Sequence, residues 1–96
     1  VLVDLDDDGD LDIVTLEFGD RPQVLISDLS ERRRIRHLAV RLTGTRSNRD
    51  GLGAVIRVRA GGRIQTQHHD GKSGYLAQSA LPLYFGLGDA DAIESV

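Results

Sequence analysis

The chain has 96 residues, a formal net charge of −3 at pH 7 and no cysteine or methionine. The lack of cysteine excludes a disulfide framework and a thiolate metal site, and no apolar run approaches the roughly 18 residues of a membrane-spanning helix. A chain this short can form one modest domain with a thin core. Because it starts with an apolar valine in a strand-like run, we expect it to be a piece of a longer protein.

The charge is unevenly distributed along the chain. Residues 1–20 contain eight acidic residues and no basic residue, so the rest of the chain carries a net charge of +5. Most of its arginines alternate with apolar residues, a pattern typical of the solvent-facing side of a strand, and aromatic residues that could stack on bases are few. We therefore expect no nucleic-acid partner.

An acidic loop is the first element of functional interest. Residues 4–12 read Asp-Leu-Asp-Asp-Asp-Gly-Asp-Leu-Asp, and alternating carboxylates can surround one cation when a glycine allows a sharp turn. Ca²⁺ suits such a loop because it is a hard cation that takes about six to eight oxygen ligands. Asp7 is expected to lie outside the ligand set. The predicted ligands are the side chains of Asp4, Asp6, Asp8 and Asp12 and the backbone carbonyl of Asp10.

The flanking sequences favour a folded calcium loop over a disordered acidic run. Residues 1–3 and 13–18 are strand-like, and the second run has the period of two that marks a strand. Close carboxylates in a folded loop repel by roughly 4 kcal/mol per pair at an effective dielectric constant near 20, so such a loop requires a cation. An EF-hand is excluded because Thr15 stands where that motif needs glutamate, and helices do not flank the loop. The sequence predicts a calcium loop inside a β-hairpin.

The rest of the chain also predicts short strands. A turn over residues 19–22 precedes a strand over 23–27, and residues 28–36 form a polar, charge-dense connection. Further strands are predicted over 37–43, 54–60, 63–69 and 81–87, and residues 92–96 begin another. Gly61-Gly62 predicts a tight hairpin, whereas residues 44–53 and 70–75 are turn-rich. With no helical stripe of useful length, the fold class is all-β, with a small antiparallel sandwich or barrel after the connection.

Four motifs in the second half carry a resemblance to a known family. They are Thr-Arg-Ser-Asn-Arg-Asp-Gly-Leu-Gly-Ala at 45–54, Gly-Gly at 61–62, Gly-Tyr-Leu-Ala-Gln-Ser at 74–79 and Phe-Gly-Leu-Gly at 85–88. With these motifs, residues 37–96 resemble an ASPIC/UnbV domain that is truncated at its C-terminal end. Residues 1–28 resemble the C-terminal part of an FG-GAP/VCBS-type β-propeller repeat, whose Asp-x-Asp-x-Asp-Gly-x-x-Asp loop binds calcium. Residues 29–36 are then a linker.

The resemblance implies a secreted, periplasmic or cell-surface protein. It assigns the calcium ligands to Asp4, Asp6, Asp8 and Asp12, and it implies that upstream propeller blades of the same chain pack against the truncated repeat. We expect a non-enzymatic extracellular calcium-binding module for protein or glycan interaction or adhesion. The alternative is an accessory, non-catalytic region of a secreted enzyme whose active site lies outside this chain. Glycan recognition through the Gly-rich loops and Tyr75 is a third hypothesis.

Two other stretches suggest chemistry but favour structural roles. His68 and His69 are consecutive in a predicted strand, so their side chains point to opposite faces and cannot converge on one ion without a bulge. The Gly-rich residues 44–53 lack the Gly-Lys-Ser/Thr ending of a phosphate loop and precede a strand instead of a helix. In that stretch, Asn48 and Asp50 are expected to cap turns. We therefore predict no catalytic residue.

Overall fold

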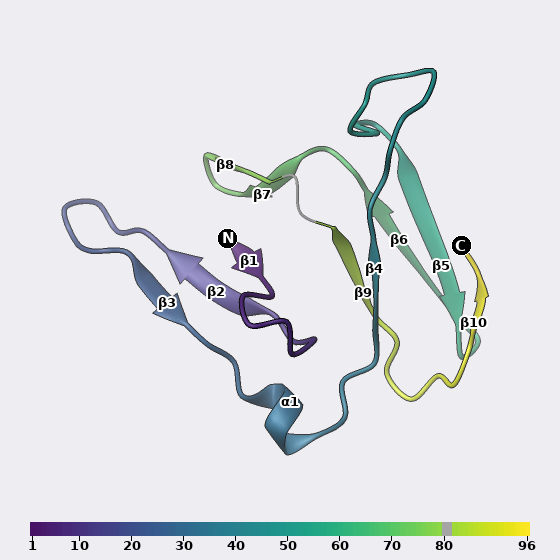
Figure 1. The fold of residues 1–96 in the computed structure, drawn as a ribbon, viewed down its shortest axis with the longest axis horizontal. Coiled ribbons are helices and arrows are strands. Elements are labelled where there is room, and N and C mark those ends of the chain that lie inside the picture. The colour runs from purple at the N-terminus through teal and green to yellow at the C-terminus, as the bar shows by residue number, and fades with distance from the viewer. Residues whose placement is uncertain (80–81) are drawn as a thin grey trace.

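The computed structural model describes residues 1–79 and 82–96 as short antiparallel strands joined by turns and one short helix (Figure 1). This confirms the predicted all-β class. No helix in the described residues is long and apolar enough to cross a membrane. The elements are β1 (Leu2–Val3), β2 (Asp12–Thr15), β3 (Gln23–Leu25), α1 (Leu29–Arg32), β4 (His37–Val40), β5 (Val55–Ala60), β6 (Arg63–His68), β7 (Lys72–Gly74), β8 (Ala77–Gln78), β9 (Leu83–Gly86) and β10 (Ile93–Ser95).

The first 25 residues form a three-stranded sheet in the order β1-β2-β3. The acidic loop joins β1 to β2, and Leu2 pairs with Ile13, which confirms the predicted hairpin. β2 is shorter than predicted: it ends at Thr15 because the chain turns through residues 17–20, where the Asp20 amide donates to the Glu17 carbonyl. Leu16 and Phe18, expected on one face of the strand, are therefore exposed.

The polar connection contains one helical turn, α1, instead of only extended chain. The sequence carries a start signal for it, an acidic residue at Asp28 with Glu31 three positions later. The Asp28 carboxylate makes no cap hydrogen bond and instead pairs with Arg32, at 2.6 Å to Nη2. The turn lies at the point where the chain leaves the first sheet and enters the second part of the molecule (Figure 1).

The second part contains two sheets that pack face to face. One has the order β10-β5-β6 and the other is the pair β4-β9. Along β5, Ile56 and Val58 are buried while Val55 is exposed, as the predicted alternation requires. They meet Phe85 of β9, which is fully buried, and half-buried side chains of β4 such as Leu38 and Val40 complete the core. The two small antiparallel sheets thus share one apolar cluster, and the described residues form no closed barrel.

Glutamine side chains connect the two sheets at their edge. The Gln65 side-chain amide donates to the Gly86 carbonyl at 2.6 Å, and that of Gln67 donates to the Tyr84 carbonyl at 2.7 Å. Both glutamines lie on β6, which pairs in full register with β5 through the two-residue Gly61-Gly62 turn, as predicted. These bonds satisfy β9 carbonyls on an edge that has no strand partner in its own two-stranded sheet.

Residues 70–75 differ from the predicted turn. They contribute β7, which pairs with β8 in a small hairpin whose tip exposes Tyr75 and Leu76 almost fully. Strands of two or three residues are too short to show a period in the sequence, which explains the difference. Of the strand predicted over 81–87, Leu81 lies outside the described residues, and Pro82 stands just before β9, where the missing N–H of proline is tolerated.

The molecule is flat and extended. Its extents are 45 × 39 × 18 Å and its radius of gyration is 15.1 Å, whereas one compact domain of this length would have a radius of about 12.5 Å. The buried apolar residues all belong to the second part: Ile56, Val58, Ala60 and Phe85. The β1-β2-β3 sheet therefore lies beside this core without sharing it (Figure 1).

Candidate metal centre

The acidic loop folds tightly around its glycine. Gly9 has φ +92°, in the left-handed region that glycine adopts without strain, and Asp7 has φ +61°, which aspartate tolerates better than most residues. Asp7 is exposed and is not among the converging carboxylates of the described residues, as expected for a residue outside the ligand set. The turn brings the chain back so that the Gly9 amide donates to Asp4 Oδ2 at 3.2 Å.

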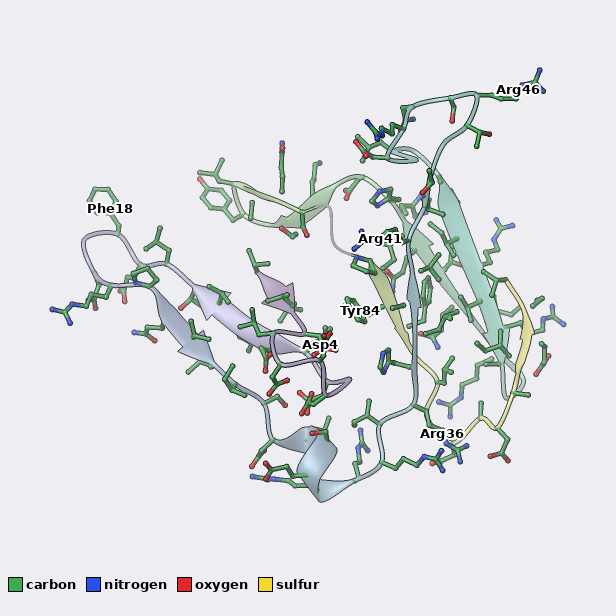
Figure 2. The ribbon with its side chains drawn as sticks, in the orientation of Figure 1. Asp4, Phe18, Arg36, Arg41, Arg46 and Tyr84 are labelled. Atoms are coloured by element: carbon green, nitrogen blue, oxygen red, sulfur yellow. The ribbon has the colours of Figure 1, made fainter. Side chains whose placement is uncertain are left out.

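Three of the predicted ligands converge in the structure. One carboxylate oxygen from each of Asp4, Asp6 and Asp8 lies within 4.8 Å of the other two. Figure 2 shows Asp4 in the acidic loop that follows β1. Oxygen donors at such separations fit a hard cation.

Asp12 and Asp10 are buried beside this group, with exposed fractions of 1% and 5%. Asp12 Oδ2 accepts the Leu5 amide and Oδ1 accepts the Ser27 amide, each at 2.8 Å. Asp12 is therefore not one of the three converging carboxylates, although an ionised carboxylate has about four lone-pair positions and keeps some of them free. The Asp10 side chain accepts the Ser30 amide at 2.7 Å through Oδ2. The Asp10 side chain thus takes part in the structure of the loop, whereas the sequence analysis assigned a role only to its backbone carbonyl.

Two carboxylate oxygens of the loop are buried without a partner in the described structure. They are Oδ1 of Asp4 and Oδ1 of Asp10. A buried polar atom is nearly always hydrogen-bonded, because leaving it unpaired costs about 1–3 kcal/mol and more for a charged group. The donor set and these two orphaned oxygens fit a cation, which would be held by Asp4, Asp6 and Asp8.

The pKa values of two carboxyls in the loop are shifted in opposite directions. The Ser30 hydroxyl and the Asp10 amide donate to Asp8 and hold the pKa of its carboxyl below the ordinary value. Loss of solvent around Asp6, together with the charges of Asp8 and Asp12, raises the pKa of the Asp6 carboxyl. An ionised Asp6 is thus disfavoured by its neighbours as long as only protein groups surround it.

Residues in and next to the connection contact the acidic loop, and the sequence analysis missed them. Ser30 contacts both Asp8 and Asp10, and Ser27 contacts Asp12. The ring of His37 lies against Gly9: a Cβ added to this glycine would come within 2.8 Å of His37 Cε1. No local sequence signal marks these contacts, because they join segments that are 15 to 28 residues apart.

The Gly-rich loop at residues 44–53 is organised by Asn48. Its side-chain oxygen accepts the Leu52 amide at 2.6 Å, and its side-chain amide donates to the Leu52 carbonyl at 2.8 Å. The prediction that Asn48 caps a turn is confirmed. The loop packs on residues 69–71, where the Gly53 amide donates to the His69 carbonyl and the His69 ring N–H donates to the Asp50 carbonyl.

A comparison with protein-family models identifies this half of the molecule. The model described as "ASPIC and UnbV" matches residues 44–96, which include the Asn48 loop and all strands from β5 to β10. The chain belongs to the ASPIC and UnbV family. No curated protein and no solved structure matches it significantly. The predicted ASPIC/UnbV resemblance is thereby confirmed for these residues.

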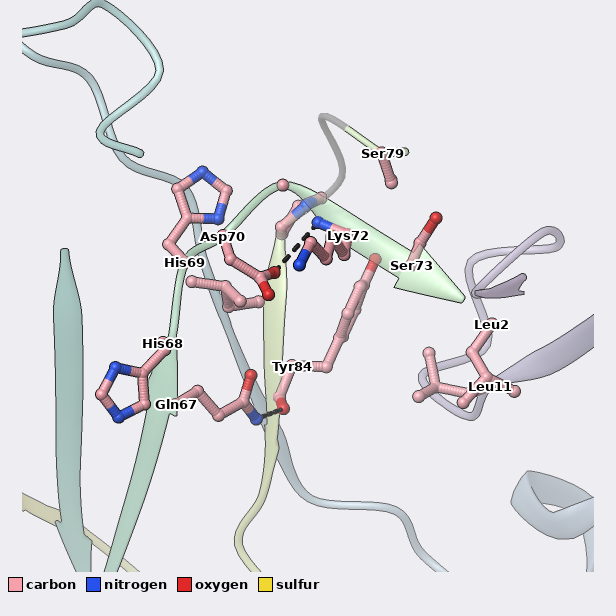
Figure 3. Close-up of a pocket in the computed structure, with 13 residues that line it drawn as sticks. Leu2, Leu11, Gln67, His68, His69, Asp70, Lys72, Ser73, Ser79 and Tyr84 are labelled. Atoms are coloured by element: carbon pink, nitrogen blue, oxygen red, sulfur yellow. Dashed lines mark hydrogen bonds between the residues drawn. The ribbon is translucent and has the colours of Figure 1, made fainter. Parts of the chain in front are cut away.

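The ASPIC/UnbV part carries a second candidate site, a hollow of about 370 Å³. His68, His69, Ser73 and Tyr84 line it, together with Leu2 of the first sheet. Figure 3 shows the two imidazoles pointing in different directions and the Tyr84 ring beside β7. In the described residues the two histidines are not part of any group of three or more side chains that could hold a metal.

Proposed function

We propose that this chain is a non-enzymatic, extracellular calcium-binding module, in which an FG-GAP/VCBS-type hairpin precedes an ASPIC/UnbV part and serves protein or glycan interaction or adhesion. The observation that carries the proposal is the convergence of Asp4, Asp6 and Asp8 beside buried oxygens that have no partner in the described structure. Bound Ca²⁺ would neutralise these carboxylates and fix the hairpin, so that its binding free energy stabilises the folded loop.

Calcium is favoured over other divalent ions by the chemistry of the donors. All of them are oxygens, and the loop offers no thiolate or imidazole among the three converging groups. The site is exposed at Asp6 and Asp8, which suits the weaker calcium affinities typical of extracellular modules, about 10⁻⁴ to 10⁻³ M. The proposal therefore includes a secreted, periplasmic or cell-surface location, where free calcium is abundant.

The first sheet supports the proposal that further blades pack beside it. Its large apolar side chains are exposed, and they include Leu2, Leu16, Val24, Leu25 and Ile26. Repeat units bury such faces against their neighbours and are marginal without them. We therefore include upstream propeller blades of the same protein as partners of residues 1–28.

The proposal is tested by thermal unfolding of the chain in 2–5 mM calcium, a range set at or above typical extracellular dissociation constants, and in excess chelator. Calcium is expected to raise the unfolding midpoint, and Asp8→Ala is expected to abolish that rise. Asp7→Ala is the matched control, because it removes a carboxylate of the same loop that lies outside the converging group. Equal responses of the two variants would contradict the ligand assignment, and no response of the wild-type chain would contradict calcium binding.

A further inference from the structure

Resting on the proposed calcium site, we propose that this site also acts as a clamp on residues 27–37, here called the junction segment, and that Ser30 is the positioning residue that couples the two. The loaded loop would hold the junction segment in place, and through it the placement of the β1-β2-β3 sheet relative to the ASPIC/UnbV part. The proposal is built on contacts that join the loop to the segment and the segment to the second part of the molecule.

Ser30 contacts the loop with both its backbone and its side chain. Its amide donates to Asp10 Oδ2 at 2.7 Å, and its hydroxyl donates to Asp8 Oδ2. Asp8 belongs to the three converging carboxylates, and its other oxygen accepts the Asp10 amide at 3.0 Å. Groups that hydrogen-bond a metal-binding carboxylate fix its orientation, and their loss typically weakens metal binding about 10- to 100-fold.

Two further contacts join the loop to the same segment. The Ser27 amide donates to Asp12 Oδ1 at 2.8 Å. At the far end of the segment, the His37 ring covers Gly9 so closely that a side chain on this glycine would overlap it. The loop is therefore contacted near the start, in the middle and at the end of the junction segment, and its conformation cannot change without loosening that segment.

The junction segment is also hydrogen-bonded to the ASPIC/UnbV part. Arg36 Nη1 donates to the carbonyls of Asp89 and Ala90, at 3.1 and 3.0 Å, and to the Asp91 carboxylate at 2.6 Å. The Leu87 amide donates back to the Arg36 carbonyl at 2.8 Å. Figure 2 shows Arg36 at the lower edge of the molecule, where the chain passes from α1 into β4. One unbroken series of contacts thus runs from the acidic loop to residues 87–91.

Among residues 1–79 and 82–96, the buried apolar cluster includes no side chain of the first sheet or of the acidic loop. Between the two parts lies a hollow of about 650 Å³ that is lined by Gly9 and Leu11 of the loop, by the junction segment, and by Tyr84 of the second part. Units with a small shared interface are expected to move relative to each other. Without a cation, repulsion among Asp4, Asp6 and Asp8 favours an open loop, which releases Ser30 and with it the junction segment.

The coupling between the calcium site and the junction segment is tested with the variants Ser30→Ala and Ser30→Thr. The control is Ser95→Ala, because Ser95 is exposed on β10, away from the loop. Calcium affinity is measured by titration calorimetry, and amide hydrogen exchange is measured with and without calcium. Ser30→Ala is expected to bind calcium about 10-fold more weakly, and Ser30→Thr, which keeps the hydroxyl, to stay close to wild type. In the wild type, calcium should slow exchange at the amides of residues 27 and 30, and Ser30→Ala should lose this slowing.

The exchange of β5 amides in the same experiment reports whether each variant retains its fold. If wild type and Ser30→Ala bind calcium equally, with the same slowing at residues 27 and 30, the clamp is overturned while the calcium site stands. If wild-type chain binds calcium but exchange at the junction segment does not respond, the clamp is overturned as well. If the wild-type chain binds no calcium, the proposed function fails and the clamp fails with it.

Discussion

The two parts of this molecule are stabilised by different kinds of interaction. The ASPIC/UnbV part has an apolar core around Val58 and Phe85. In the first 28 residues the buried side chains are Asp10 and Asp12, while the large apolar side chains of the β1-β2-β3 sheet are exposed. The ASPIC/UnbV part should thus resist changes in ionic conditions, whereas the first sheet depends on the pairing of its carboxylates and, by our proposal, on calcium.

The packed core and the charged candidate site lie in different parts of the molecule. The residues that match the family model supply a scaffold whose stability can be traced to packed side chains. The acidic loop lies outside the matched range and concentrates charge at the edge of a sheet that has little core of its own. A test that perturbs one part should therefore leave the other nearly unchanged, except through the junction segment.

The largest expected effect comes from removing the centre of the core. Phe85→Ala should destabilise the ASPIC/UnbV part by about 3–5 kcal/mol, because it removes a fully buried aromatic side chain and leaves a cavity. Phe18→Ala is the matched control: Phe18 lies at the tip of the β2–β3 turn and is fully exposed (Figure 2), so its loss should change stability by no more than about 0.5 kcal/mol. Urea denaturation followed by far-UV circular dichroism measures both.

Equal destabilisation by these two variants would break the comparison, because it would mean that the first sheet buries Phe18 as deeply as the second part buries Phe85. Calcium should not rescue Phe85→Ala, since its cavity lies away from the acidic loop. A rescue by calcium would show that the two parts share one cooperative unit.

A medium effect is expected at the contact between the two parts. Gly9→Ala should cost roughly 1–3 kcal/mol, because alanine is strained at φ +92° and its Cβ must displace the His37 ring. Gly19→Ala supplies the control, since Gly19 has a similar φ of +84° with nothing within 4 Å of an added Cβ. The excess cost at Gly9 measures the contact with His37.

A double-mutant cycle isolates that contact. In a His37→Ala background, Gly9→Ala should cost no more than Gly19→Ala does, since the backbone strain is then the only remaining penalty. Thermal unfolding in the presence of calcium provides the four stabilities. If His37→Ala leaves the excess cost of Gly9→Ala unchanged, Gly9 and the His37 ring are not in contact in solution.

Much of this architecture was predictable from local sequence patterns. The β5–β6 hairpin follows from strict alternation around Gly61-Gly62, and Ile56 and Val58 face the core as that alternation requires. The acidic loop could be located in the same way. Asp4, Asp6 and Asp8 occupy every second position of the sequence, and the structure brings their carboxylates together. Both are short-range features, in which the period of the backbone decides where each side chain points.

The contacts that complete the site could not be predicted in this way. Ser30 meets Asp8 across 22 residues, and that meeting depends on where the chain turns after β3. The β7–β8 hairpin was missed because strands of two or three residues give no period. The early end of β2 has a similar origin: the alternation continues to Phe18, but the turn at residues 17–20 draws the chain away from the sheet.

The smallest expected effect is also the most specific for the first part, because its sign depends on calcium. Neighbouring charges and loss of solvent raise the pKa of Asp6, so its ionised form destabilises the cation-free fold. That cost is complete above the raised pKa and vanishes below the pKa of the unfolded chain. Asp6→Asn should therefore slightly raise the unfolding midpoint in chelator at pH 7, and lower it in calcium, where a ligand charge is lost.

Asp8 provides the contrast within the same loop. Hydrogen bonds from Ser30 and Asp10 lower the pKa of Asp8, so its ionised form stabilises the fold at neutral pH, and this stabilisation disappears as the pH falls through the lowered pKa. Asp8→Asn should accordingly lower the midpoint both in chelator and in calcium. The measurement is the unfolding midpoint of Asp6→Asn and of Asp8→Asn at pH 7, in chelator and in calcium. If Asp6→Asn and Asp8→Asn shift the midpoint in the same direction in chelator, the repulsion at Asp6 is not what a cation relieves, and the electrostatic basis of the proposed clamp is lost.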